Sequence, residues 1–182
     1  MSTLRFAIVT VAFSFFLTVA RGEGNVNPYR NAKVGDWVEY KMTGPNVEGT
    51  TRMTVLSKED KELTYEITGT FSFMGNTSAA PVQRMKIDLT KSYDAVSAAN
   101  LKANDVKIEK LEEGKETLKV AGKEYDTKWT RLRTTASAGG MTIVSNYKMW
   151  FCDEVPLSGL VRMDTTTSGT TMTVELTGLR KK

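Results

Sequence analysis

The stretch from Trp37 to Met42 reads WVEYKM and contains the pattern that decides the fold. Three apolar residues, Val38, Tyr40 and Met42, alternate with two charged ones. A period of two is typical of a β-strand with one face against a core and the other in water. The stretch therefore predicts a half-buried strand with an apolar inner face.

The same pattern recurs along most of the chain. We predict further strands at residues 49–56, 63–73, 82–89, 106–111, 117–120, 124–135, 141–151, 160–166 and 170–176. Turn signals separate them, among them Glu113-Gly114 and Ser168-Gly169. Residues 75–81 are predicted as a loop, and the alanine-rich residues 93–101 as one short helix. We expect a mainly β fold, in which an antiparallel meander of about ten strands forms an open or incomplete barrel.

The first 22 residues have the three parts of a secretory signal peptide. Arg5 provides the basic start, residues 6–19 are an uncharged apolar run, and Ala20 and Gly22 are the small residues before the cleavage point. Cleavage after Ala20 is the alternative to cleavage after Gly22. An uncleaved anchor is a further alternative, but the run is short for about 30 Å of hydrocarbon. We expect a periplasmic or secreted protein with a single β-rich domain at residues 23–182.

Composition excludes several kinds of chemistry. The chain has no histidine and one cysteine, Cys152. It cannot form histidine-based nucleophile systems, histidine or all-cysteine zinc sites, or an internal disulfide. Removing Arg5 and Arg21 with the signal peptide lowers the 25 basic residues to 23, against 21 acidic ones, a net charge of +2. We expect neither an enzyme nor a bound metal or cofactor.

The charged residues suggest two other functions, catalysis by carboxylates and binding of nucleic acid. Adjacent acids such as Asp153-Glu154 offer carboxylates for acid–base chemistry, although neighbouring acids in a polar loop are usually solvated. Basic and aromatic residues interleave between Tyr125 and Arg133, as in proteins that bind single-stranded nucleic acid. The plainer interpretation is a strand with one end at a barrel mouth. An exported protein meets little nucleic acid, so we expect no such partner.

Large flexible and aromatic side chains gather on the predicted strands. Methionine adapts its shape, so methionine-rich strands suit a surface that accepts varied apolar ligands, although an ordinary packed core explains the same residues. We predict five ligand-binding residues: Tyr40, Met85, Trp129, Met149 and Phe151.

Several segments together carry a family resemblance. They are the signal peptide, VGDWVEY at residues 34–40, Trp150 shortly before DEVP at residues 153–156, and GLVRMDTTTSGTTMTVELTG at residues 159–178. This layout resembles bacterial periplasmic proteins of the lipoprotein-localisation-factor type. The resemblance implies a strongly curved, incomplete antiparallel barrel covered by helix, with an apolar cavity for acyl chains. The chain departs from that family in its low predicted helix content, and the arginine embedded in the carrier's barrel has no clear counterpart.

Two functions from different classes follow. The first is an exported, non-catalytic binding protein with a concave β-surface for an apolar or amphipathic, lipid-like ligand. The second is a structural or interaction protein of the cell envelope with a filled barrel, whose threonine-rich edge from Thr165 to Thr173 pairs with a partner strand. The expected partner is accordingly an apolar small molecule or an envelope protein. Membrane association is expected only if the signal peptide is retained.

Overall fold

The computed structural model describes residues 27–91, 106–138 and 141–182. The predicted signal peptide and the predicted helix at residues 93–101 lie outside these ranges. Within them, the only helix is a short 3-10 turn, η1 (Pro28–Asn31), just before the first strand. No helix in these ranges has the length and apolar character needed to cross a membrane.

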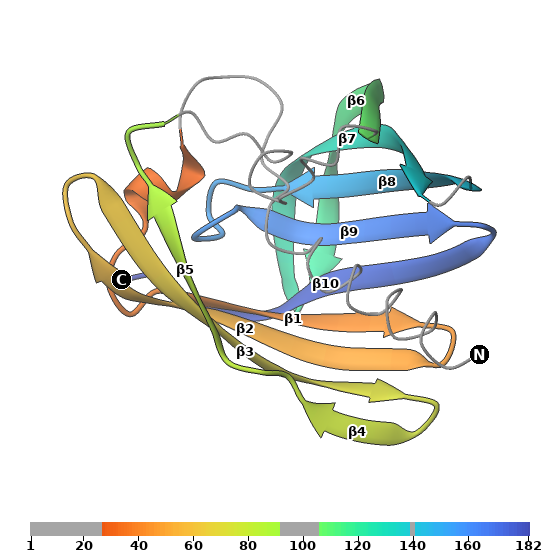
Figure 1. Ribbon diagram of the computed structural model, residues 1–182. Helices are drawn as coiled ribbons and strands as arrows, with labels where there is room; N and C mark the ends of the chain where they lie inside the picture. Colours follow the sequence, from red (N-terminus) through yellow and green to blue (C-terminus); the bar gives the residue numbers. More distant parts are fainter. Residues whose placement is uncertain (1–26, 92–105, 139–140) are drawn as a thin grey trace.

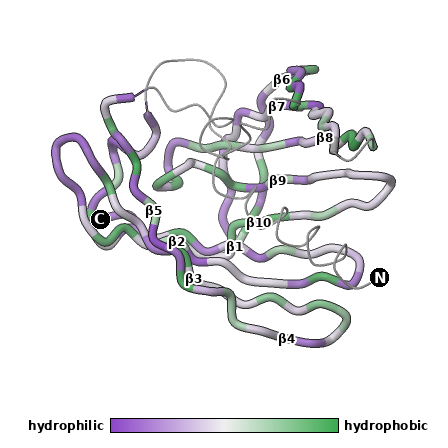
Figure 2. Tube along the Cα trace, in the orientation of Figure 1, coloured by the Kyte–Doolittle hydropathy of each residue, from purple (hydrophilic) through white to green (hydrophobic). Residues whose placement is uncertain are grey.

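Ten antiparallel strands form a single sheet (Figure 1). They are β1 (Trp37–Gly44), β2 (Val47–Lys58), β3 (Glu62–Phe73), β4 (Asn76–Ala79), β5 (Gln83–Asp88), β6 (Val106–Val120), β7 (Lys123–Ala138), β8 (Met141–Phe151), β9 (Leu160–Thr167) and β10 (Thr170–Arg180). The predicted mainly β fold of about ten strands is confirmed. Figure 2 shows hydrophilic and hydrophobic residues interleaved along the strands, as expected for a sheet with one apolar face.

The sheet consists of two meanders that meet at β1 and β10. The strand order is β4-β3-β2-β1-β10-β9-β8-β7-β6. Strands β4 and β5 both pair with β3 on the same edge: β5 pairs with its first half and β4 with its last four residues. Tyr40 lies opposite Leu176 in the β1–β10 pair that joins the two halves. The chain leaves the sheet at β5 on one edge and re-enters it at β6 on the other. These edges do not pair with each other, so the curved sheet stays unclosed.

The predicted turn at Glu113-Gly114 is wrong, because β6 runs through it as one strand. Gly114 lies opposite Trp129 of β7, and a Cβ on Gly114 would stand 2.7 Å from atoms of the indole ring. The glycine provides room for the ring, which is one of the few roles that favours glycine inside a strand. The predicted loop at residues 75–81 is also wrong in part, because residues 76–79 form β4 against β3.

The hairpin of β9 and β10 begins as the sequence predicts, but it does not form an edge of the sheet. Ser168 and Gly169 have φ angles of 51° and 78°, which a two-residue hairpin turn requires. Thr167 pairs with Ser145 of β8, and Thr173 pairs with Thr43 of β1. The predicted threonine-rich edge is therefore wrong, because strands lie on both sides of this hairpin.

The core lies on the face of the sheet that carries Val38, Tyr40 and Met42, which we call the inner face. Tyr40 shows how the sheet curves towards this face, because its hydroxyl donates a 3.0 Å hydrogen bond to the carbonyl of Leu160 on β9, two strands away. The opposite, outer face carries most of the paired charges of the strands, beginning with Glu39 beside Arg52.

Candidate ligand-binding face

One end of the inner face is completely packed. This packed end consists of Val38, Val55, Leu63 and Tyr65 with Tyr29 of η1, and each of these residues is at most 1% exposed. The rings of Tyr29 and Tyr65 stack with centroids 5.7 Å apart. The loop between β8 and β9 adds the buried Val155 and Leu157 to the same core. This end lies at the left of Figure 1, around η1 and β5.

Polar side chains fasten η1 over the packed end. Asn27 donates from its amide to the carbonyl of Asp88 at 3.1 Å. The guanidinium of Arg30 donates to the carbonyl of Leu89 at 2.8 Å. The ammonium group of Lys58 donates to the carbonyl of Arg30 at 2.6 Å. Because each bond satisfies a backbone carbonyl in η1 or at the end of β5, these bonds fix η1 over this end of the sheet.

Towards the hairpin turns at the right of Figure 1, side chains on the inner face become less completely buried. We call this part, which consists of the three rows of residues described next, the open end. Its first line of cross-strand neighbours, the methionine row, runs across six strands. In order from β8 it contains Met149, Met163, Val174, Met42, Gly49 and Phe71. The four residues from Met149 to Met42 in this row are 1–6% exposed, whereas Phe71 is half-buried.

The next row is apolar but less covered. Leu132, Tyr147, Thr165 and Met172 are consecutive cross-strand neighbours on β7 to β10, and Val47 pairs with Phe73 on β2 and β3. Tyr147 is 8% exposed, and the other five have intermediate exposure. This part of the inner face therefore presents apolar surface that the described residues leave partly uncovered.

A third row consists of hydroxyl groups. Thr134, Ser145 and Thr167 are cross-strand neighbours on β7, β8 and β9. The hydroxyls of Ser145 and Thr167 lie 2.7 Å apart and share a hydrogen bond. Burial raises the pKa of the Tyr147 phenol above its ordinary value, while hydrogen bonds with Thr134 and Ser145 act in the opposite direction. We call these four residues the hydroxyl cluster.

The open end has almost no charge at its inner-face positions. Among the described residues of the three rows and their partners on β6, the charged positions are Lys110, opposite Leu132, and Glu113, opposite Thr130. The two charges pair with each other at 2.6 Å. Along the strands the inner face thus passes from a methionine row to a hydroxyl row without meeting an unneutralised charge.

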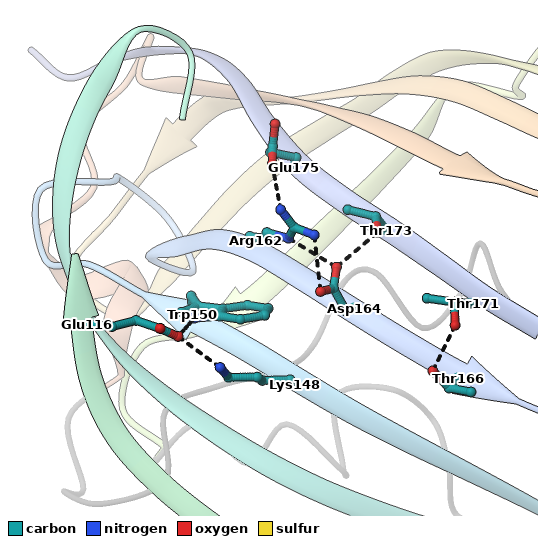
Figure 3. Close-up of polar contacts among 9 residues, drawn as sticks. All are labelled: Glu116, Lys148, Trp150, Arg162, Asp164, Thr166, Thr171, Thr173 and Glu175. Carbon is teal, nitrogen blue, oxygen red and sulfur yellow. Dashed lines mark hydrogen bonds and ion pairs between the residues drawn. The ribbon is translucent and has the colours of Figure 1, made fainter. Parts of the chain in front are cut away.

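The outer face, by contrast, carries charged side chains that pair with one another. Lys148 lies 4.5 Å from the ring centres of both Trp129 and Trp150, and it pairs with Glu116 at 2.8 Å. Trp150 also donates its indole N–H to Glu116. Figure 3 shows Glu116, Lys148 and Trp150 beside a second group, in which Arg162 contacts carboxylates on two strands. Hydrogen bonds with Lys148 and then Trp150 lower the pKa of Glu116. Charges here are neutralised by neighbours, as in a structural cross-strand ladder.

The structure brings together four of the five predicted site residues. Tyr40, Met149 and Phe151 are buried on the inner face, and Met85 of β5 packs against the same core with intermediate exposure. Trp129 lies on the outer face, because its neighbour Thr130 is the β7 residue opposite Met149. The alternation of Trp129 with outer-face arginines already indicated this.

Sequence reasoning did not single out several inner-face residues of the open end. They are Val47, Phe71, Phe73, Leu132, Met172 and the hydroxyl cluster. The period of two could have found them, if each alternation had been extended to the end of its strand. Hydroxyl residues would also have had to be counted as inner-face positions. In the part of the chain that the structure describes, no group of three or more histidine, cysteine or acidic residues is placed to hold a metal ion.

Only solved structures resemble this chain, and the resemblance is one of fold. No protein-family model and no curated protein matches the chain. It is similar to a solved "putative exported protein" of Bacteroides fragilis with a YmcC-like fold, at a TM-score of 0.50 and 10% identity, over 84% of this chain and 99% of that one. A "putative lipoprotein" of Parabacteroides distasonis gives a TM-score of 0.47 and 10% identity, over 86% and 100%. The chain therefore shares with the Bacteroides fragilis protein a curved antiparallel β-fold.

Proposed function

We propose that this is an exported, non-catalytic protein that binds an apolar or amphipathic, lipid-like ligand on the inner face of its open sheet. The observation that carries the proposal is the contrast within that face. One end is sealed by η1 and the β8–β9 loop, while the other keeps half-buried apolar residues such as Phe71, Phe73 and Met172. Exposed apolar surface of this kind is costly unless something binds to it.

Export is part of the proposal and rests on residues 1–22, with their basic start, apolar run and small-residue exit. The similar fold of a protein described as exported supports it. Expression of the full chain in a Gram-negative host, followed by N-terminal sequencing of the envelope fraction, tests it. We expect a mature form that begins at Glu23 or Arg21. Recovery of the uncleaved chain in the cytoplasm would contradict export.

A role without catalysis fits the distribution of acids. Glu116, Asp164 and Glu154 are each within hydrogen-bonding distance of a lysine or arginine, and the first two lie on the outer face. Carboxylates that are neutralised in this way are poor general bases.

Strand addition by an envelope partner, the alternative function, depends on a receptive sheet edge. The two edges are β6 on one side and β4 with β5 on the other. On β6, lysine and glutamate residues occupy most positions, and the pairing with β7 is irregular between Lys110 and Glu112. The other edge is broken by Pro81 between two short strands. Charges, bulges and proline protect edges against pairing, which weighs against this alternative.

Native mass spectrometry and organic extraction of the exported protein test ligand binding. We expect a co-purifying lipid-like species that is reduced several-fold in Phe73→Gln, since a polar side chain would interrupt the half-buried surface. Met74→Gln is the matched control, because Met74 is the next residue and is 64% exposed. Circular dichroism of both variants checks that the sheet is intact. A protein that neither carries nor binds any amphiphile would contradict the proposal.

A further inference from the structure

The hairpin of β7 and β8 projects beyond the strands on either side of it. The pairing of β6 with β7 begins at Val106 and Ala136, and the pairing of β9 with β8 ends at Thr167 and Ser145. In the described part of the chain, residues 141–144 therefore have β7 as a neighbour but no partner on β9. We call these four residues the β8 tip, which lies with the other hairpin turns of the open end at the right of Figure 1.

The β8 tip is apolar and exposed on both of its faces. Met141 is 59% exposed, Ile143 is 42% exposed and Val144 is 40% exposed. Consecutive strand residues point to opposite faces of a sheet, so Ile143 and Val144 show that the described chain covers neither face here. Clustered apolar side chains that stay exposed in this way are typical of a surface with a partner.

Charged residues are absent from the sequence around the β8 tip and around the other hairpin turns of the open end. The uncharged segments are residues 42–47, 67–83, 134–147 and 165–174, although charged residues make up 25% of the chain. The first charge after the β1–β2 turn, Glu48, pairs with Lys41 at 2.6 Å. At the opposite end of the strands, the β2–β3 turn contains the charged residues 59–61. The two ends of the sheet therefore differ in charge as well as in burial.

We propose that the β8 tip inserts into the interface of a lipid bilayer and docks the open end of the protein on a membrane whose surface needs no net charge. Charged side chains are strongly disfavoured in hydrocarbon, and the uncharged segments contain none. Apolar side chains that enter the boundary between headgroups and acyl chains bind in proportion to the area they bury. The proposal differs from the sequence-based expectation that only a retained signal peptide would bring the protein to a membrane.

The position of Lys107 sets the depth of insertion. Lys107 lies opposite Thr135, and Thr135 lies opposite Val144, so the lysine on β6 is level with the last residue of the tip. An ammonium group at this level would contact lipid phosphates, while Met141 and Ile143 lie deeper. The tip therefore enters the interface without crossing the bilayer.

A protein partner or a second copy of the chain fits the β8 tip less well than a bilayer. Specific protein interfaces bury about 800 Å² on each partner and centre on a packed cluster of side chains. Three apolar side chains at the end of one projecting hairpin do not form such a cluster, whereas a fluid bilayer needs no matching patch. The inference goes beyond ligand binding, because the tip lies beyond the three rows of the open end.

Flotation of the exported, processed protein with phosphatidylcholine vesicles tests the docking. We expect the wild-type protein to float with the vesicles. Ile143→Asp should lower the partition coefficient about tenfold, because it places a charge in the bilayer interface. Met141→Asp should have the same effect from a more exposed position. The matched control is Leu56→Asp, because Leu56 is 39% exposed on β2 beside the charged β2–β3 turn, and it should leave the partition coefficient unchanged.

Salt dependence separates the uncharged tip from the surface charges. Because the tip carries no charge, partition into phosphatidylcholine vesicles should be equal in low and high salt. Anionic phosphatidylglycerol should not be required. Binding that needs anionic lipid and is lost in high salt would overturn the inference, because surface lysines and arginines would then be its cause.

A fluorescent label tests the orientation directly. Cys152 is buried, so Ile143→Cys provides the accessible thiol for a bimane label. Nitroxide-labelled acyl chains should quench this bimane in vesicles and should not quench one attached to Leu56→Cys. Equal quenching at both positions would contradict docking through the β8 tip.

The outcomes separate this inference from the proposed function. If the protein carries an amphiphile in native mass spectrometry but does not float with vesicles, ligand binding stands and the docking inference is overturned. If the protein floats and neither carries nor binds an amphiphile, docking stands and the proposed function fails. Flotation of both aspartate variants like the wild type would overturn docking through the tip. A dimer in sedimentation that Ile143→Asp dissociates would overturn it in favour of a second copy.

Discussion

The two ends of the inner face belong to one sheet but differ in how completely their side chains are buried. At the packed end, Leu63 and Tyr65 are fully buried under η1, and side chains such as Asn27 satisfy the backbone around them. At the open end, β3 presents half-buried Phe71 and Phe73. The packed end holds the sheet together, whereas the open end keeps apolar surface that the described residues leave partly uncovered.

If the open end binds the proposed ligand, the unclosed sheet divides stability from binding along its strand direction. A fully buried side chain contributes its whole transfer free energy to folding, whereas a half-buried one contributes only part. Surface that contributes little to folding can be given to a ligand at little cost in stability. The predictions below test this division, beginning with the largest expected effect.

Matched leucine truncations should separate the two ends most clearly. Leu63→Ala at the packed end should lower the free energy of unfolding by about 3 kcal/mol, because it removes a fully buried side chain and leaves a cavity. Leu132→Ala at the open end should cost about 1 kcal/mol, because that residue is partly exposed. Urea denaturation measures both values. Equal costs would show that the two ends are packed alike.

Removal of the η1 fastening should have a smaller effect. Asn27→Ala should lower the free energy of unfolding by about 1 to 2 kcal/mol, because it removes the side-chain hydrogen bonds to the Tyr29 N–H and the Asp88 carbonyl. Hydrogen exchange should accelerate at Tyr29 and leave Thr167 at the open end unchanged. The exposed Asn76→Ala serves as control, with a change within about 0.5 kcal/mol. Faster exchange at both ends would contradict separate roles.

The two ends should also respond differently to acid. Hydrogen bonds from the Thr90 hydroxyl and then from its backbone N–H lower the pKa of Asp88, beside η1, from 3.8 to about 2. Ionised Asp88 therefore favours the folded state, and this contribution is complete above about pH 4 and is lost as the pH falls towards 2. Thr90→Val should raise the pKa of Asp88 towards its ordinary value, as measured by carboxyl NMR titration. An unchanged pKa would contradict this.

The hydroxyl cluster at the open end should show no such response. Its one ionisable side chain, Tyr147, has a pKa raised above the ordinary phenol value by burial. Binding of an uncharged amphiphile to the open end should therefore stay constant between pH 4 and pH 8, as measured by calorimetry. An affinity that changes with pH in that range would contradict this.

Much of the sheet follows from local sequence, because the period of two is a property of the extended backbone itself. The alternation in residues 37–42 and 160–166 predicted strands that the structure confirms. The turn predicted at Glu113-Gly114 failed because the reason for Gly114 is the ring of Trp129, which reaches it through strand pairing. The position of the threonine-rich hairpin failed for a similar reason, since strand order decides which strand is an edge.

Of the candidate site, the sequence predicted only part of the placement. Tyr40, Met85, Met149 and Phe151 lie on the inner face or pack against its core, and their role in binding stays a prediction. Trp129 lies on the outer face because it shares a face of β7 with Arg131 and Arg133, and its residue type was given more weight than that position. Val47 and Phe73 were missed because half-burial depends on what covers a strand end, which the residues themselves do not state.

The sequence by itself determined the class of fold, the alternation of faces along most strands, and the exclusion of histidine-dependent chemistry. These are local properties of backbone geometry and composition. Only the tertiary structure decided that β1 pairs with β10, that Met42 continues the row of Met149 and Met163, and that one end of the face is sealed while the other is not. Those features depend on register between strands far apart in the chain and on the segments that pack over them, which no local pattern contains.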